Sequence, residues 1–212
     1  MKNIKLIIFD LDGTLVDAYA AIGSSFNYVM RKLALKPQSI STVRRLVGWG
    51  DINLLKPYVR QGDLKYALSL YRRHHKYSLL KHSHLYPHAR SLLRHLKEKG
   101  YKLAVASNRP SKFSRILLRH LDIGIFFDYV LCADQTRHGK PHPEILNKIV
   151  KRFAFKKSQT LYVGDMVIDA QAGKRAKINT VIVTSGSSSK LDIKREQPFR
   201  IISAIRRLQE LL

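Results

Sequence analysis

The chain has 212 residues, 45% of them hydrophobic, which is enough for one full core with about 60 residues to spare for an insertion or small second domain. It carries 39 Lys and Arg against 15 Asp and Glu, a formal net charge of +24 at pH 7. This charge predicts attraction of anionic partners, with a proteome-wide basic bias as the alternative explanation. A single cysteine excludes an intramolecular disulfide and a cysteine-rich zinc site, and the absence of a signal-peptide or membrane-length apolar run predicts a cytoplasmic protein without a membrane partner.

The first predicted element is a strand over residues 4–9, and it ends in a pair of carboxylates. Asp10 and Asp12 stand two residues apart, so in an extended chain both side chains point to the same side. Gly13 follows at once and permits a sharp turn that exposes backbone N–H groups. A strand that ends in this way offers an acid pair to a substrate.

The next segment, residues 17–83, has no good strand pattern and is expected to form an all-helical insertion. Helical character covers residues 20–34, 42–46, 52–59 and 64–80. Trp49 stands between two glycines, which predicts a loop. It is a candidate for substrate selection, with packing as the alternative. His74 and His75 fall on a basic helix and are expected on the solvated surface.

From residue 84 onward, apolar runs alternate with segments of helical period. Strands are expected over residues 102–107, 129–132, 160–164 and 180–184. A core-packing helix is expected within 87–100, and a last helix from Ser203. This alternation predicts an α/β fold, a Rossmann-like parallel sheet with helices on both faces.

Chemically useful side chains follow four of the predicted strands. Ligands bind outside the carboxyl ends of the strands in an open parallel sheet, so these side chains are expected to meet in one crevice. Taken singly, each has a plain structural explanation, such as a turn, a helix cap or a surface lysine. The combination is what indicates a site, and it consists of Asp10, Asp12, Ser107, Asn108, Lys140, Asp165 and Asp169.

The order of these motifs resembles the haloacid-dehalogenase-like phosphohydrolase superfamily. The matching segments are Phe9-Asp10-Leu11-Asp12-Gly13-Thr14-Leu15-Val16-Asp17, Gly139-Lys140-Pro141-His142-Pro143-Glu144 and Val163-Gly164-Asp165. The helical insertion looks like the superfamily's first type of cap, which implies a cap over 17–83 and a catalytic core formed by 1–16 and 84–212. Within the superfamily the chain is most similar to the phosphoglycolate phosphatase and nucleotide pyrophosphatase group, including Arg44-Arg45-Leu46-Val47-Gly48-Trp49-Gly50 in the cap.

The resemblance implies a Mg²⁺-dependent phosphatase of a small phosphorylated metabolite, with phosphoglycolate as the first substrate to test. Asp10 would attack phosphorus and form an aspartyl-phosphate, while Asp12 would protonate the leaving oxygen and then activate water. Asp10 and Asp165, together with the Asp12 carbonyl, would hold the Mg²⁺ ion. The first motif therefore supplies both the nucleophile and metal ligands.

The remaining residues of the set would bind phosphate or support the site. Lys140 would neutralise the transferring phosphoryl group, and Ser107 with the Asn108 backbone N–H would bind its oxygens. Asp169, one helical turn after Asp165, would support the metal or its waters, or orient Lys140. These four positions complete the expected phosphoryl site.

Departures from the family patterns limit the alternatives. A dehalogenase would lack Asp12, and sugar phosphomutases tend to carry Glu where this chain has Gly164 and an aliphatic residue at Thr14. A nucleotidase or pyrophosphatase is the first alternative. A sugar phosphomutase and a basic nucleic-acid-binding protein are the others, although the chain carries no nucleic-acid-binding motif and such contact would be nonspecific. The sequence leaves the choice between monomer and dimer open.

Overall fold

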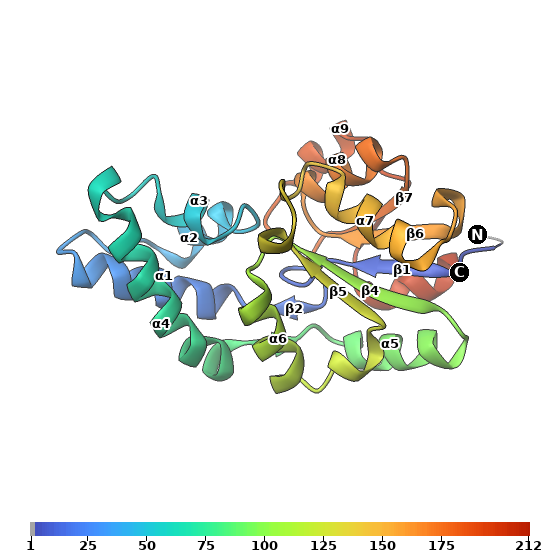
Figure 1. The fold of residues 1–212 in the computed structure, drawn as a ribbon, viewed down its shortest axis with the longest axis horizontal. Coiled ribbons are helices and arrows are strands. Elements are labelled where there is room, and N and C mark those ends of the chain that lie inside the picture. The colour runs from blue at the N-terminus through green and yellow to red at the C-terminus, as the bar shows by residue number, and fades with distance from the viewer. Residues whose placement is uncertain (1–2) are drawn as a thin grey trace.

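The computed structural model describes residues 3–212, and a parallel sheet lies at its centre (Figure 1). Its six strands follow the order β5-β4-β1-β6-β7-β8, and every neighbouring pair is parallel. The strand bounds are β1 (Leu6–Phe9), β4 (Lys102–Ser107), β5 (Tyr129–Cys132), β6 (Thr160–Gly164), β7 (Asn179–Val183) and β8 (Arg200–Ile202). The strand that ends at the acid pair, β1, is therefore central, and β4 and β6 place their own carboxyl ends on either side of it.

Helices cover both faces of the sheet. Figure 1 shows α5 (Ala89–Glu98) and α6 (Ser111–His120) on one face, and α7 (Glu144–Phe153), α8 (Val167–Ala176) and α9 (Lys190–Arg195) on the other. The side chains of β1 alternate accordingly: Ile7 and Phe9 share a core with α5 and α6, while Leu6 and Ile8 pack with α7 and α8. A strand buried on both faces needs the continuous apolar run that this sequence has. The predicted Rossmann-like class is confirmed.

A second group of helices lies beside the end of the sheet where β1 terminates (Figure 1). It comprises α1 (Tyr19–Lys32), α2 (Ile40–Leu46), α3 (Asp51–Leu55) and α4 (Leu64–His82). Phe26 and Met30 of α1 and Leu79 of α4 are buried in the same cluster as Phe9 of β1. The chain enters and leaves this group through a two-stranded antiparallel ribbon, β2 (Val16–Asp17) and β3 (His84–Leu85).

The C-terminal segment departs from the expected α-helix. A 3₁₀-helix covers Ile205–Leu211, with Ala204 rather than Ser203 at its N-cap position. Ile205 and Leu208 are both buried and stand three residues apart, a spacing that a 3₁₀-helix aligns on one side. Four other short 3₁₀ segments cover Gln61–Asp63, Gly124–Phe126, Ala133–Gln135 and Lys157–Gln159. Within residues 3–212, no helix combines the length and apolar character needed to cross a membrane.

Candidate active site

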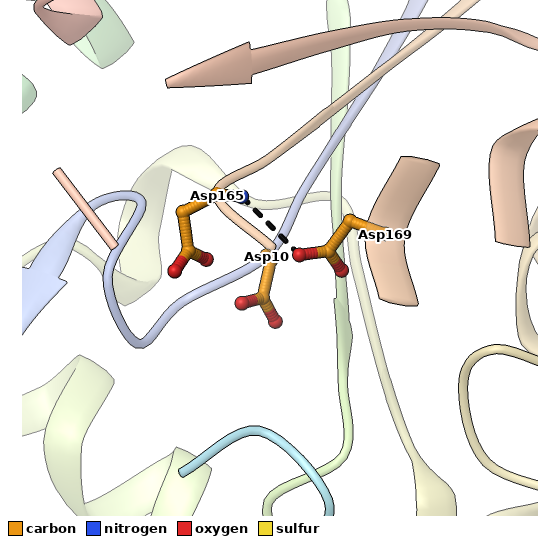
Figure 2. Close-up of side chains that lie close together, drawn as sticks. All are labelled: Asp10, Asp165 and Asp169. Atoms are coloured by element: carbon orange, nitrogen blue, oxygen red, sulfur yellow. Dashed lines mark hydrogen bonds between the residues drawn. The ribbon is translucent and has the colours of Figure 1, made fainter. Parts of the chain in front are cut away.

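Three buried carboxylates meet at the carboxyl edge of the sheet (Figure 2). Asp10 follows β1, Asp165 follows β6, and Asp169 lies in the first turn of α8. One carboxylate oxygen from each lies within 4.8 Å of the others. Gly13 turns the chain just beyond β1 with φ of +87°, and any side chain there would collide with the Asp165 carboxylate. A glycine at that turn is therefore a condition for Asp165 to reach the cluster.

Lys140 is the cation of this cluster. Its Nζ donates to Asp10 Oδ1 at 2.7 Å, to Asp169 Oδ1 at 2.7 Å and to the Tyr162 hydroxyl at 3.0 Å. Burial opposes its charge, but Asp10 and Asp169 outweigh burial and raise the pKa of Lys140 above its ordinary value. Lys140 is therefore a permanently charged group beside Asp10.

Asp169 has four hydrogen-bond donors around it. Its Oδ1 accepts from Lys140 and from the Tyr162 hydroxyl at 2.6 Å, and its Oδ2 accepts from the backbone N–H groups of Asp165 at 3.2 Å and Met166 at 3.0 Å. Figure 2 marks the bond from the Asp165 backbone. Both oxygens are thus engaged by protein groups. In this geometry Asp169 orients Lys140 and fixes the chain at Asp165.

The cluster holds more acid than its single lysine neutralises. Burial, together with the neighbouring Asp169 and Asp12, raises the pKa of Asp10 to about 7 against the opposing effect of Lys140. Burial, with Asp169 and Asp10, likewise raises the pKa of Asp165 well above its usual range. Such a site gains stability from a further positive charge.

A carboxylate oxygen of Asp165 without a hydrogen-bond partner among the described residues indicates where a cation can bind. Asp165 Oδ1 accepts a hydrogen bond from Thr14 Oγ1 at 3.0 Å, whereas Asp165 Oδ2 is buried without a hydrogen-bond partner in residues 3–212. Oxygen ligands of this kind suit a hard divalent cation. Asp10 and Asp165 therefore fit a divalent metal ion.

Asp12 is held outside this cluster by Arg109. The guanidinium donates from Nη2 to Asp12 Oδ1 at 2.6 Å and from Nε to Asp12 Oδ2 at 2.9 Å. Arg109 Nη1 lies 2.7 Å from Nε2 of His75 on α4. Arg109 follows Ser107-Asn108 directly, but the sequence reasoning gave it no role.

The expected solvated position of His75 is wrong. Its side chain is only 2% exposed, and burial together with Arg109 lowers its pKa well below the ordinary value, which keeps the ring neutral. The neutral ring accepts from Arg109 through Nε2, and its Nδ1 lies 3.1 Å from Ser25 Oγ of α1. Tyr71, Ser78 and Leu79 are also buried, at spacings of three and four residues from His75. That spacing was the available signal for an inward-facing histidine.

Ser107 and Asn108 occupy the loop after β4. Ser107 is buried, and its Oγ accepts from the Arg109 backbone N–H at 3.2 Å. The Asn108 side chain accepts from the Lys140 backbone N–H at 2.7 Å and donates to the Lys140 carbonyl at 2.9 Å. It also donates to the Gly48 carbonyl at 2.9 Å. The Asn108 amide thus fixes the backbone of Lys140 and contacts the loop after α2.

A small cavity of about 60 Å³ lies between the helical insertion and the sheet. The sequence-predicted residues that line it are Asp10, Asp12, Ser107, Asn108, Lys140 and Asp169. Asp165 lies behind this wall, fully buried. Trp49 is 45% exposed and lines a larger outer groove of about 810 Å³, while Gly48 and Gly50 beside it line the small cavity.

A second connection joins the insertion to the sheet loops. Arg44 of α2 donates from Nη2 to the carbonyls of Ser185 at 2.8 Å and Gly186 at 3.3 Å. Its guanidinium lies 4.2 Å from the centre of the Tyr19 ring. With the contacts of Asn108 and His75, this bond holds the insertion against the site.

Comparisons with known proteins agree with this architecture. The family model described as haloacid dehalogenase-like hydrolase matches residues 7–183. A phosphoglycolate phosphatase of Pseudomonas fluorescens is 32% identical over 96% of this chain and 78% of its own, and one of Nitrosococcus oceani is 29% identical over 100% and 98%. A solved structure from Haemophilus somnus, described as a predicted phosphoglycolate phosphatase, superposes with a TM-score of 0.94 at 28% identity and covers 100% of this chain and 99% of that one.

Proposed function

The chain belongs to the haloacid dehalogenase-like hydrolase family, and from this premise we propose that it is a Mg²⁺-dependent phosphatase acting through an aspartyl-phosphate. The proposed substrate is a small phosphorylated metabolite, with phosphoglycolate first because the relatives carry that name. One observation carries the proposal: Asp10 ends the central strand with Lys140 on one oxygen and Asp165 within ligand distance. That arrangement supplies a nucleophile, a cation and a metal site at one point.

The proposed reaction begins at Asp10. Lys140 engages its Oδ1, which leaves Oδ2 to attack phosphorus and form a phosphorus–oxygen bond. The bond from phosphorus to the leaving oxygen breaks, and Asp12 gives that oxygen a proton. Water then attacks the phosphoryl group, gives its proton to Asp12, and releases phosphate with the Asp10 carboxylate restored. Ser107 and Lys140 stabilise the charge on the phosphoryl oxygens throughout.

The proposed metal site uses Asp10, Asp165 and the carbonyl of Asp12. A bound Mg²⁺ ion would neutralise the phosphoryl oxygens and favour the ionised form of Asp10. Asp169 acts differently in this proposal, because Lys140, Tyr162 and two backbone N–H groups occupy its oxygens. Its role is to position Lys140.

We assign residues 17–83 as a cap and residues 1–16 with 84–212 as the catalytic core. The pairing of β2 with β3 supports this division, because the chain passes from core to helices and back through one ribbon. The cap closes the cavity through Arg44 and His75 and excludes bulk water during phosphoryl transfer. Substrate entry then requires the cap to open.

The test is phosphate release from phosphoglycolate and from a generic aryl phosphate, with and without Mg²⁺. We expect Asp10→Asn to lower turnover by roughly 10³-fold or more. Asp128→Asn is the control, because Asp128 pairs with Lys97 and Lys102 just before β5 and far from the carboxyl edge. Equal activity of wild type and Asp10→Asn would refute the assigned nucleophile.

A nucleotidase or pyrophosphatase is the second candidate function. The outer groove of about 810 Å³ favours it, since Trp49, Arg137 and Arg175 line that groove and offer an aromatic surface and positive charge to a larger leaving group. A panel of nucleotides, pyrophosphate, sugar phosphates and phosphoglycolate separates the two candidates. Higher kcat/KM for a nucleotide than for phosphoglycolate would favour the second.

A further inference from the structure

Arg109 is a buried cation that the proposed phosphoryl chemistry leaves without a task. It is only 7% exposed, lines the small cavity, and is held by the Asp12 carboxylate on one side and His75 on the other. An arginine guanidinium is always charged in proteins, and a buried one needs an anionic partner.

The bond to Asp12 conflicts with the role proposed for Asp12. Both carboxylate oxygens accept from Arg109, at 2.6 and 2.9 Å. A group that protonates the leaving oxygen must have one oxygen free to carry the proton. If Asp12 turned away alone, Arg109 would remain buried without a counter-charge, which is strongly unfavourable. Some other anion must therefore take the place of Asp12.

The small cavity limits what that anion is. Asp10, Ser107 and Lys140 share its wall with Arg109, so an anion bound to Arg109 lies beside the proposed phosphoryl site. The cavity also contains Lys140, but Asp10 and Asp169 already match that charge. Arg109 presents Nε and Nη2 as a fork that already holds a planar carboxylate. A carboxylate on the substrate itself meets these conditions.

We propose that Arg109 determines specificity by binding a carboxylate of the phosphate ester, and that this exchange releases Asp12 to act as the acid. The inference rests on the proposed phosphatase function and deepens it: the substrate class is a small phosphorylated hydroxy acid. In the cycle, Asp12 leaves Arg109, takes a proton from solvent, and passes it to the departing hydroxy-acid oxygen as the Asp10–phosphorus bond forms. His75 is a positioning residue that holds Arg109 Nη1 from the cap.

The test compares two esters that differ only at the proposed contact. Phosphoglycolate carries a carboxylate where ethyl phosphate carries a methyl group. We expect wild type to favour phosphoglycolate by about 10- to 150-fold in kcat/KM, the range for hydrogen bonds to a charged group. Arg109→Gln should bring the ratio of the two kcat/KM values close to 1, because phosphoglycolate loses its carboxylate contact and Asp12 is no longer held away from either ester. An equal fall on both esters would show that Arg109 serves Asp12 alone, and would overturn the proposal.

Two further variants serve as a charge control and a conservative substitution for this test. Arg137→Gln removes the same charge at the outer groove, so it measures general attraction of anions and should leave the ratio between the esters unchanged. Arg109→Lys keeps the charge but loses the fork, and should give an intermediate ratio. It replaces Arg109→Gln if that variant fails to fold. An unchanged ratio in Arg109→Lys and Arg109→Gln would also overturn the assignment.

Binding separates failure of this inference from failure of the proposed function. Calorimetry with Asp10→Asn in Mg²⁺ measures the affinity for phosphoglycolate and for ethyl phosphate without turnover. If the protein binds phosphoglycolate more tightly than ethyl phosphate and Arg109→Gln abolishes that difference, the carboxylate contact is supported. This holds even if wild type hydrolyses neither ester, although the absence of hydrolysis would refute the phosphatase function. Hydrolysis of both esters at equal kcat/KM with equal binding would leave the phosphatase intact and refute the carboxylate contact.

Discussion

Thr14→Val tests whether Asp165 carries its charge only when a metal ion is bound. Thr14 is fully buried and donates to Asp165 Oδ1 at 3.0 Å, while Asp165 Oδ2 has no hydrogen-bond partner within residues 3–212. Burial, together with the neighbouring Asp169 and Asp10, raises the pKa of Asp165 well above its usual range, which favours the neutral carboxyl when no metal is bound. Loss of the hydrogen bond should then lower the free energy of unfolding by about 1 kcal/mol without metal, the value for a neutral pair. With a bound cation that ionises Asp165, the loss should be about 1.5–3 kcal/mol.

The difference between those two losses is a loss of metal affinity. An additional cost of about 1 kcal/mol in the metal-bound state corresponds to roughly 5-fold weaker Mg²⁺ binding. Urea unfolding with and without saturating Mg²⁺ measures both losses, and a Mg²⁺ titration measures the affinity. Thr180→Val is the matched control, because Thr180 is also buried but donates to a neutral carbonyl, that of Ile178.

An equal loss from Thr14→Val with and without Mg²⁺ would refute the expected change in the charge of Asp165. Equal weakening of Mg²⁺ binding by both variants would refute it as well, because Thr180 lies near the start of β7, at the opposite end of the strand from the carboxyl edge, and its hydroxyl donates to Ile178. The first result would mean that the Asp165 carboxylate has the same charge with and without the ion, and the second that the lost Mg²⁺ affinity does not come from the Thr14–Asp165 hydrogen bond.

Three other perturbations bear on the same site. Lys140→Met leaves Asp10 and Asp169 buried without their cation, so it should lower the free energy of unfolding by about 3–5 kcal/mol at pH 7. The loss should be smaller at pH 4, where Asp10, with a pKa of about 7, is protonated, and equal losses in urea unfolding at both pH values would contradict this. Without metal, wild type should lose stability between about pH 4 and 7, because unfolded Asp10 releases its proton near 3.8 and folded Asp10 near 7. Mg²⁺ should therefore raise Tm more at pH 8 than at pH 5, and the reverse order would refute it. Arg44→Gln removes the bond from α2 to Ser185 and should raise KM about 2- to 10-fold, whereas Arg45→Gln, on the exposed face, should not.

The sequence predicted the sheet core well because its strands are buried on both faces. The runs that became β4, β5 and β6 have the expected bounds, since a continuous apolar stretch between turn residues has few other uses. The strands β2, β3 and β8 were not predicted, because two or three residues carry no periodicity. The final segment was expected as a helix and forms a 3₁₀-helix, a distinction that the spacing of three between Ile205 and Leu208 does not make, because both helix types place such residues on one face.

The positions of the site residues were predictable where a side chain directly follows the end of a strand. Asp10 and Asp165 follow their strands directly, so parallel topology alone places them together. The pairing of Asp12 with Arg109 and His75 was not predictable in this way, because it joins β1, β4 and the insertion across 97 and 34 residues of chain. Such contacts depend on how the insertion packs against the sheet, which no local pattern encodes.

The short ribbon of β2 and β3 brings the two ends of the insertion together. Val16 pairs with Leu85 and Asp17 with His84, so the two ends of a 66-residue excursion, residues 18–83, lie side by side. A segment with adjacent ends can be lengthened, shortened or exchanged at little entropic cost to the sheet that it leaves. The carboxyl edge of the sheet and the insertion that lies against it can thus change in sequence and length independently of each other.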